Sequence, residues 1–393
     1  GKLKRISMGC AEGFKFAVND VFKRQSLEIV TFTGAVPSYG VENVWSDSQA
    51  RTMVFVIPEG DAAWAEIVSG ATVLSEEERK ACHAAHPDWP IPFAVVDKSV
   101  FKTKNEQYLA YVGSDKGVKL EIDRDTFFDD TVTVTTDWSP YSDGTYPKGT
   151  VATLTATPGA TGRFVKWYGD VPGAVSSEQS VTVTLSGDSW VYARFVHPWT
   201  LSSDRTKMYN GNFTVNCSVV DANARTLQVG KNDVGTGVGG IYADDNGSGV
   251  LDIGGDITEQ GSALSWKIVR LSYGKGAWTS PLSGKVKTLV TPSTLISEAS
   301  RHDTQMLHYG SGYSYNTMII DEPSADWGWK VDWYCAARIK RFVFRVPKLT
   351  AMSGNYGLSG AGTLKGTKLD WWDISAVGSI GGDTLRTNTD NPP

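Results

Sequence analysis

Aromatic side chains gather in one stretch, from Tyr309 to Tyr334, in the last third of the chain. Its members are Tyr309, Tyr313, Tyr315, Trp327, Trp329, Trp333 and Tyr334. Aromatic faces stack on sugar rings and anchor protein interfaces, so this stretch is a candidate binding surface. The candidate ligand-binding residues are Tyr313, Tyr315, Trp327, Trp329 and Trp333. Asp321, Glu322 and Asp326 would supply polar partners, and the alternative is that these rings fill a core.

Metal and nucleotide motifs are weak in this sequence. Cys82 and His86 are four residues apart and would share one face of a helix, but a zinc site needs three or four ligands. The run Asp244–Gly249 lacks the alternating acids and the final Glu of a calcium loop, which favours a flexible hairpin turn. The run Gly235–Gly240 opens no evident helix, so it does not fit a dinucleotide-binding fingerprint. We therefore expect no metal and no cofactor.

Hydrolytic motifs are equally weak. Ser297 or Ser300 could join His302 and Asp303 in a triad, but no G-x-S-x-G elbow occurs, and triads are recognised by geometry rather than by proximity in sequence. Asp370 and Asp373 flank two tryptophans and could be read as a glycosidase pair. A repeat strand with solvated acids is the favoured interpretation of that segment. The sequence therefore predicts a protein that is not an enzyme.

Composition limits the class of protein. The 393 residues carry a net charge of −5, which argues against a basic nucleic-acid footprint. Hydrophobic residues make up 40% and charged residues 21%, as in a globular protein. No apolar run approaches the roughly 20 residues of a membrane span, and no signal peptide is recognisable. The chain starts with Gly rather than Met, so we expect an internal fragment of a longer protein.

Four cysteines lie far apart, and they form no C-x-x-C pair of the kind found in zinc ribbons. They are Cys10, Cys82, Cys217 and Cys335. Three disulfide pairings are open to four cysteines, and the sequence does not choose among them. We favour mostly buried free thiols, because free cysteine packs as a small hydrophobe.

Local signals in the first hundred residues predict short strands and helices. Strands are expected in residues 26–33 and 51–57, where apolar residues cluster between turn formers. Asp61 is a candidate N-cap for a short helix. Ser75 and Glu78 form a capping box that starts a second helix, which a proline-rich stretch then stops.

Residues 131–197 form the clearest unit. Apolar and polar residues alternate with period two in 131–135, 150–156 and 180–185, which predicts half-buried strands. The segment 162–172, followed by 181–185 and 192–195, resembles the divergent internalin-B-type B repeat, with Trp167 and Phe195 at the family's core aromatic positions. The resemblance implies a small β-grasp-like module that serves as a spacer in bacterial surface and secreted proteins.

A second resemblance is to BspA-like leucine-rich repeats. Segments 22–32 and 54–60, with Trp64, resemble a repeat followed by a closing strand and terminal helix. Segments 348–352 and 376–380 resemble two irregular repeats. Within this region Val343, Val346, Leu349 and Met352 are matched, at one constant offset, by Trp371, Ile374, Val377 and Ile380. Such an offset, within the roughly 20 to 50 residues typical of repeat proteins, implies a solenoid whose repeats bury their apolar faces on one another.

The expected fold class is mainly β, with irregular leucine-rich-repeat solenoid segments flanking a small β-grasp-like B-repeat module. The expected domains are a repeat array with its cap (1–69), a connector with a short helix and strands (70–130), the B-repeat-like module (131–197) and a second, truncated repeat region (198–393). Short strands are expected within that last region near 266–269, 286–290, 318–320 and 342–346.

The resemblances imply a non-catalytic protein of the bacterial surface or the extracellular space. It would bind a host or neighbouring-cell protein or glycan through repeat surfaces, without nucleic acid and without a membrane span. Two alternatives stay open. One is a polysaccharide-binding accessory region of a larger secreted enzyme, and the other is a purely structural stalk. The step from fold to adhesion rests on family analogy.

Overall fold

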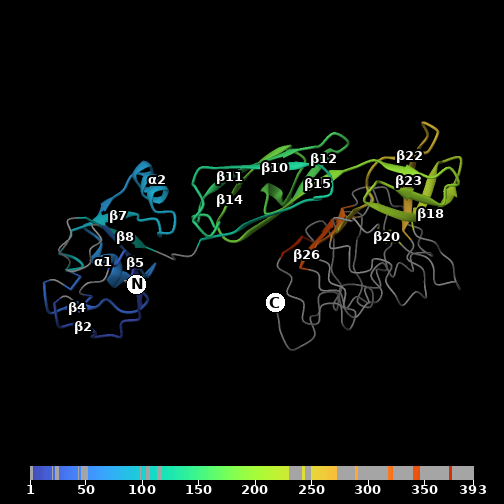
Figure 1. Ribbon diagram of the computed structural model, residues 1–393. Coiled ribbons are helices and arrows are strands. Elements are labelled where there is room, and N and C mark those ends of the chain that lie inside the picture. Colours follow the sequence, from blue (N-terminus) through green and yellow to red (C-terminus); the bar gives the residue numbers. More distant parts are fainter. Residues whose placement is uncertain are drawn as a thin grey trace, which may run out of the picture. The chain divides into compact units, whose positions relative to one another are not determined.

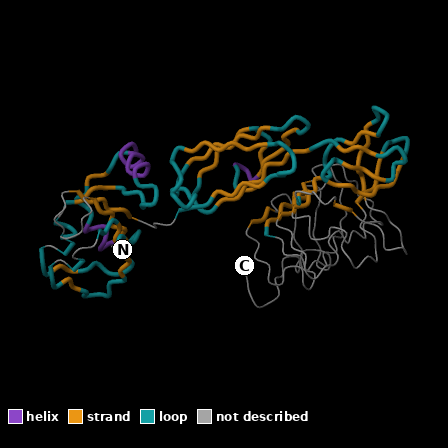
Figure 2. The backbone as a smooth tube through the Cα atoms, viewed as in Figure 1, coloured by secondary structure: helices purple, strands orange, loops and turns teal. Residues whose placement is uncertain are grey.

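A computed structural model describes residues 3–19, 21–22, 26–42, 44–45, 52–97, 99–102, 107–112, 117–229, 241–243, 249–271, 288–290, 317–321, 340–345 and 371–373. These residues are mainly β, as the sequence predicts, with only short helical segments (Figures 1 and 2). The chain forms two compact units. One unit holds residues 1–121, 135–153 and 183–189, and the other holds residues 122–134, 154–182 and 190–393.

A six-stranded sheet dominates the first unit, in the order β1-β3-β5-β8-β7-β6. Its strands are β1 (Arg5–Met8), β3 (Ile29–Phe32), β5 (Thr52–Ile57), β6 (Thr72–Val73), β7 (Ala94–Val96) and β8 (Gln107–Val112). The pairs from β1 to β8 are parallel, and β7 and β6 then add antiparallel strands. Paired residues of β1, β3 and β5 are 24 and 25 positions apart in the chain. A small parallel ladder of β2 (Lys15–Phe16) and β4 (Ser38–Tyr39) accompanies them.

Both predicted helix starts are confirmed. Helix α1 (Ala62–Ile67) begins after Asp61, whose side chain accepts hydrogen bonds from the backbone N–H groups of Ala63 and Trp64. Helix α2 (Glu76–Ala85) begins with the complete Ser75–Glu78 capping box. Such caps satisfy backbone donors that the first turn of a helix leaves unpaired.

Aromatic rings fill the core of this sheet. Phe55 stacks on Phe101 with ring centroids 4.0 Å apart, and Phe32 packs against Trp64 at 4.9 Å. Trp64 also donates from Nε1 to the carbonyl oxygen of Gly34 over 2.8 Å. The indole is therefore buried without leaving its N–H unpaired.

The same sheet runs across the boundary expected between residues 69 and 70. After β5 the chain forms α1, β6, α2 and β7 and then returns to pair β8 directly with β5. The residues expected to be a connector, up to Val112, thus complete the sheet that begins with β1. Hydrogen bonding between neighbouring strands decides this grouping, and the local sequence carries no signal of which strands pair.

Two sheets make up the B-repeat-like module. One has the order β10-β11-β14 and the other the order β13-β12-β15-β9. The strands are β9 (Leu120–Asp123), β10 (Thr131–Thr136), β11 (Val151–Thr157), β12 (Arg163–Gly169), β13 (Val175–Ser176), β14 (Ser180–Thr184) and β15 (Ser189–Val196). The alternation in 131–135, 150–156 and 180–185 is therefore confirmed as strands.

The β-grasp description does not fit this module. A β-grasp sheet packs around an α-helix, whereas residues 131–197, all of them described, contain only the 3-10 turn η1 (Pro172–Ala174). Pro172 and Gly173 account for the short turn, because proline opens it and Gly173 adopts a positive φ of 71° that ends regular helix. Strand β9, from before residue 131, completes the second sheet beside β15.

A seven-stranded sheet follows, in the order β17-β16-β22-β23-β19-β18-β20. Its strands are β16 (Trp199–Leu201), β17 (Lys207–Tyr209), β18 (Phe213–Asp221), β19 (Thr226–Val229), β20 (Ile241–Ala243), β22 (Ile257–Glu259) and β23 (Ser265–Leu271). An additional pairing of β17 with β18 closes six of these strands into a barrel. This corrects the expectation of a repeat region from residue 198 onward. Antiparallel hairpins such as β18–β19 build the barrel, whereas a solenoid ladder is parallel.

A parallel ladder of five strands holds the remaining described residues, in the order β21-β24-β25-β26-β27. Its strands are β21 (Val250–Asp252), β24 (Thr288–Val290), β25 (Thr317–Asp321), β26 (Arg341–Arg345) and β27 (Trp371–Asp373). The predicted repeat offset is wrong at its first pair, which would set Trp371 beside Val343. Instead, Trp371 lies beside Arg341, and Val343 lies beside Asp373. The irregular spacing along the ladder explains why one fixed period fails.

Candidate functional site

The predicted ligand-binding aromatics Tyr313, Tyr315, Trp327, Trp329 and Trp333 lie outside the described residues. Their expected polar partner Asp321 is described, and it has a different role. Asp321 is 5% exposed and accepts hydrogen bonds from Lys166 Nζ over 2.7 Å and from the Tyr168 hydroxyl over 2.9 Å. Its carboxylate is committed to an internal ion pair, which corrects its assignment as a ligand contact.

The remaining chemical candidates are described only in part. Within the described ranges no group of three or more His, Cys, Asp or Glu side chains is placed to hold a metal ion. The ring of His86 stacks on Trp89, with centroids 3.8 Å apart. Cys10, Cys82 and Cys217 are free thiols. The candidates Asp244–Ser248, Gly235–Gly240, Ser297, Ser300, His302, Asp303 and Asp370 lie outside the described residues, as does Cys335.

The second sheet of the module joins the parallel ladder through an apolar core. From the module come Tyr168, Trp190 and Tyr192, with Val175 packed against them. From β24, β25 and β26 come Val290, Ile319 and Val343. All of these except Val175 are at most 4% exposed. We call this cluster the docking core.

Ion pairs accompany the docking core. Arg194 on β15 donates two hydrogen bonds to Asp252 on β21, over 2.7 and 2.9 Å, and the two side chains are 6% and 8% exposed. Burial opposes the charge on Arg194, but Asp252 and Tyr168 together outweigh this effect and raise the pKa of the guanidinium above its usual value. Arg341 donates to Asp123 over 2.8 Å, and its guanidinium lies over the Trp190 ring. The module is thus fixed to the ladder by geometry-specific contacts.

A buried histidine–aspartate pair lies just before the first strand of the barrel. His197 Nε2 and Asp130 Oδ2 are 2.7 Å apart, and both side chains are at most 4% exposed. Phe128 stacks on the imidazole at 3.5 Å. These contacts order the chain just before Trp199 enters β16, so the module continues into the barrel without a loose linker.

An open cleft of about 470 Å³ lies on the second unit. It is lined by Arg163, Ala224, Arg225, Ile253, Gly254, Gly255, Asp256, Ile257, Ser265, Trp266, Lys267 and Ile268. We call it the basic cleft, because three of these side chains are cations and only one is an acid. The cations come from the start of β12, the turn between β18 and β19, and β23. This excess of cations suits an anionic ligand.

Hydrogen bonds fix the backbone that carries Arg225 and Lys267. Asp221 accepts from the backbone N–H groups of Asn223 and Ala224, which forms the turn that leads into Arg225. Arg225 has a positive φ of 52°, and its carbonyl accepts from the N–H of Lys267 over 3.0 Å. Two of the three cations are therefore held side by side through the backbone.

Two glycines form the floor of the basic cleft. A Cβ atom on Gly255 would collide with the carbonyl oxygen of His197, and one on Gly254 would collide with the guanidinium of Arg194. Only glycine permits the backbone to lie this close to the ion pair beneath it. The floor of the cleft is thus coupled to the Arg194–Asp252 pair.

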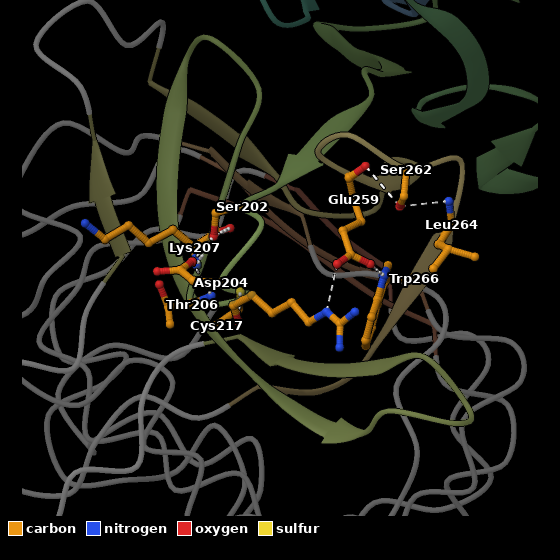
Figure 3. A network of polar contacts seen from close by, with 10 residues as sticks. Ser202, Asp204, Thr206, Lys207, Cys217, Glu259, Ser262, Leu264 and Trp266 are labelled. Carbon is orange, nitrogen blue, oxygen red and sulfur yellow. Dashed lines mark hydrogen bonds and ion pairs between the residues drawn. The ribbon is translucent and has the colours of Figure 1, made fainter.

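Trp266, which lines the basic cleft, belongs to a polar network around Glu259, shown in Figure 3. The Glu259 carboxylate accepts from Arg205 Nε over 2.8 Å and from Trp266 Nε1 over 3.1 Å. The hydrogen bond from Arg205 holds the pKa of Glu259 below its usual value, so the carboxylate is charged at neutral pH. The Arg205 guanidinium also lies 4.9 Å above the Trp266 ring. Trp266 is consequently locked, and only 4% of it is exposed.

The comparisons agree with one part of the sequence analysis. Residues 131–197 match the family described as the divergent InlB B-repeat domain. No curated protein and no solved structure matches the chain. The family match confirms the B-repeat resemblance, whereas no family match supports the leucine-rich-repeat resemblance. Among the described residues, no helix is long and apolar enough to span a membrane.

The basic cleft has no signature in the sequence, because its cations are widely separated in the chain. Arg163, Arg225 and Lys267 belong to no motif, and each is an ordinary exposed residue in its own segment. The one local signal is the turn-forming Asp221, which marks a hairpin but not a binding site. Strand pairing in the barrel brings the segments of Arg225 and Lys267 together.

Proposed function

We propose that this chain is a non-catalytic protein of the cell surface or extracellular space that binds a host protein or glycan through its repeat surfaces. The observation that carries the proposal is the docking of a B-repeat domain onto a parallel ladder. B-repeat domains of this type are typical of surface proteins. A ladder held in this way presents its outer side chains as one fixed surface.

The parallel strands of the first unit also support a repeat interpretation of that end of the chain. In β1, β3 and β5 paired residues recur every 24 or 25 positions, within the range of repeat lengths that build solenoids. We propose that these strands derive from irregular repeats of the leucine-rich kind. The proposal rests on spacing and parallel pairing, without a family match.

Docking argues for a binding role over a freely swinging spacer. The docking core removes large aromatic side chains from water, and Arg194 and Lys166 have their carboxylate partners outside the module. A preorganised surface loses less conformational entropy when it binds a partner. A fixed module is therefore more useful to a protein that binds a partner than to one that only separates two domains.

A screen of the full chain against glycan arrays and extracellular-matrix proteins tests the proposal. We expect saturable binding that weakens about tenfold or more when Trp327 and Trp329 are replaced by Ala, because anchor aromatics dominate many interfaces. The matched control is Trp138→Ala, a half-buried tryptophan of the other unit. Residues 131–197 alone are a poor control, because excision would expose Trp190 and Tyr192. Absence of binding at high micromolar concentration would contradict the proposal and favour a structural stalk.

A second candidate function is a polysaccharide-binding accessory region of a larger secreted enzyme. The basic cleft favours this candidate, because open clefts with convergent polar groups are typical ligand sites. A glycan-only binding profile, without any matrix protein, would support it over adhesion to a host protein.

A further inference from the structure

We infer that the basic cleft binds the anionic groups of an acidic polysaccharide, one bearing carboxylates or sulfates along its sugar units. The inference rests on the proposed function and narrows its ligand class. It places this contact on the barrel and on the first residue of β12, and none of the lining residues belongs to the predicted aromatic stretch. The cleft and the aromatic stretch can therefore be tested by separate substitutions.

The charges of the cleft favour an anion. In the described part of the chain, neither Arg225 nor Lys267 forms an ion pair, and both side chains are exposed. Arg163 faces Asp256 across 3.8 Å, with 57% and 82% of the two side chains exposed. Exposed pairs of this length contribute little, so a ligand anion can take the place of Asp256. Arginine guanidinium groups then bind carboxylate or sulfate with two parallel hydrogen bonds.

The rest of the lining fits a sugar better than a nucleic acid. Single-stranded nucleic acids bind through aromatic faces on which their bases stack, and the Trp266 ring is covered by Arg205 and is 4% exposed. The Asp256 carboxylate would repel a dense series of phosphates but accepts hydrogen bonds from sugar hydroxyls. Ser265 offers a hydroxyl that both donates and accepts. A sugar with hydroxyls and spaced anions matches this mixture.

The cleft is also built before the ligand arrives. Its glycine floor is fixed against His197 and Arg194, and the backbone of Arg225 is bonded to that of Lys267. Little ordering of the backbone is therefore needed on binding, which reduces the entropic cost. Open, preformed clefts of this kind accommodate one segment of a long chain.

Calorimetric titration of the full chain tests the inference. The probes are a heparin octasaccharide, an oligogalacturonate octasaccharide, a neutral dextran oligosaccharide and a single-stranded dT oligonucleotide. We expect both acidic octasaccharides to bind, more weakly at high salt, and the neutral one not to bind. The double variant Arg225→Gln and Lys267→Gln should weaken binding about tenfold or more, since hydrogen bonds to charged groups are strong. The control variant Lys119→Gln and Lys148→Gln removes the same charge elsewhere and should change affinity less than about twofold.

Three results would overturn the inference. The first is equal weakening in the two double variants, which would show only a general charge effect. The second is dT binding as tight as that of the octasaccharides and lost with Arg225 and Lys267, which would indicate a nucleic-acid site. The third is binding of glycans or matrix proteins that depends on Trp327 and Trp329 but not on the cleft, which leaves the proposed function standing. If no probe and no matrix protein binds, both proposals fail.

Discussion

The core of the first unit and the docking core of the second are built differently. Around Phe55 the first unit buries stacked rings, and the indole N–H of Trp64 donates to a backbone carbonyl beside them. The docking core also buries aromatics, but Arg194 with Asp252 and Lys166 with Asp321 accompany it. An apolar core tolerates many packings of similar volume, whereas buried ion pairs accept only one alignment. The contrast indicates that the first core supplies stability and the second supplies orientation.

Phe55→Ala tests the apolar side of this comparison and should have the largest effect. The substitution leaves a cavity against Phe32 and Phe101 and should cost about 4 kcal/mol of unfolding free energy. The measurement is the first urea-unfolding transition of the full chain. Val73→Ala, at a position 72% exposed, is the control and should stay within about 0.5 kcal/mol of the unmodified protein. An equally small effect of both changes would contradict the assignment of the core.

Arg194→Met tests the ion-paired side. It leaves Asp252 buried without its partner and should cost about 3 kcal/mol of stability. The double variant Arg194→Met with Asp252→Leu removes both charges and should recover most of the loss, as measured by calorimetry of the second unit. If the double variant stays stable but no longer holds the module in one orientation against the ladder, small-angle scattering should show a broader size distribution. If the double variant were as unstable as the single one, the pair would matter for stability itself.

The reactivity of the Cys217 thiol reports how well the second unit buries a side chain outside its docking core. Burial raises the pKa of Cys217 to about 12, against an ordinary value of 9.0. The raised folded-state pKa means that the contribution of the neutral thiol to stability is intact below pH 9 and is lost as the pH rises toward 12. At pH 8.5 iodoacetamide should modify Cys217 at least about tenfold more slowly in the native chain than in urea. Peptide mass spectrometry measures both rates, and equal rates would contradict the burial.

Trp138→Ala should have the smallest effect. The ring lies 5.3 Å from the Arg79 guanidinium and 5.5 Å from the Lys80 ammonium, both on α2. Loss of these contacts should cost about 1 kcal/mol, because exposed cation–π contacts are weak. Trp138→Phe keeps an aromatic face and should lose less in the same unfolding measurement. A loss as large as that of Phe55→Ala would show that this contact belongs to a core.

Local features of this chain could be predicted from sequence, and distant ones could not. Ser75 and Glu78 act within three residues, so their capping box is legible in the sequence. The alternation in 150–156 likewise reports burial on one face of β11. Arg194 and Asp252 are 58 residues apart, and closure of the barrel by β17 and β18 depends on partner choice among many strands. Neither leaves a local pattern.

The basic cleft shows the same limit from the functional side. Each of its cations occupies a segment with ordinary turn or strand chemistry, and only the three-dimensional arrangement makes their charges add. The aromatic stretch had the opposite property, since its residues are conspicuous in sequence. The amino-acid composition therefore indicates the aromatic stretch as a candidate site, whereas only the pairing of strands reveals the basic cleft.

The edge of the six-stranded sheet in the first unit affects how readily the protein can associate with itself. Its outermost strand β6 has only two residues, and it lies antiparallel to β7. Edge strands present unpaired N–H and C=O groups to other chains, and short edges present few of them. A neighbouring molecule would find little here on which to extend the sheet. On this side the protein can accumulate at high density with a low tendency to form edge-to-edge aggregates.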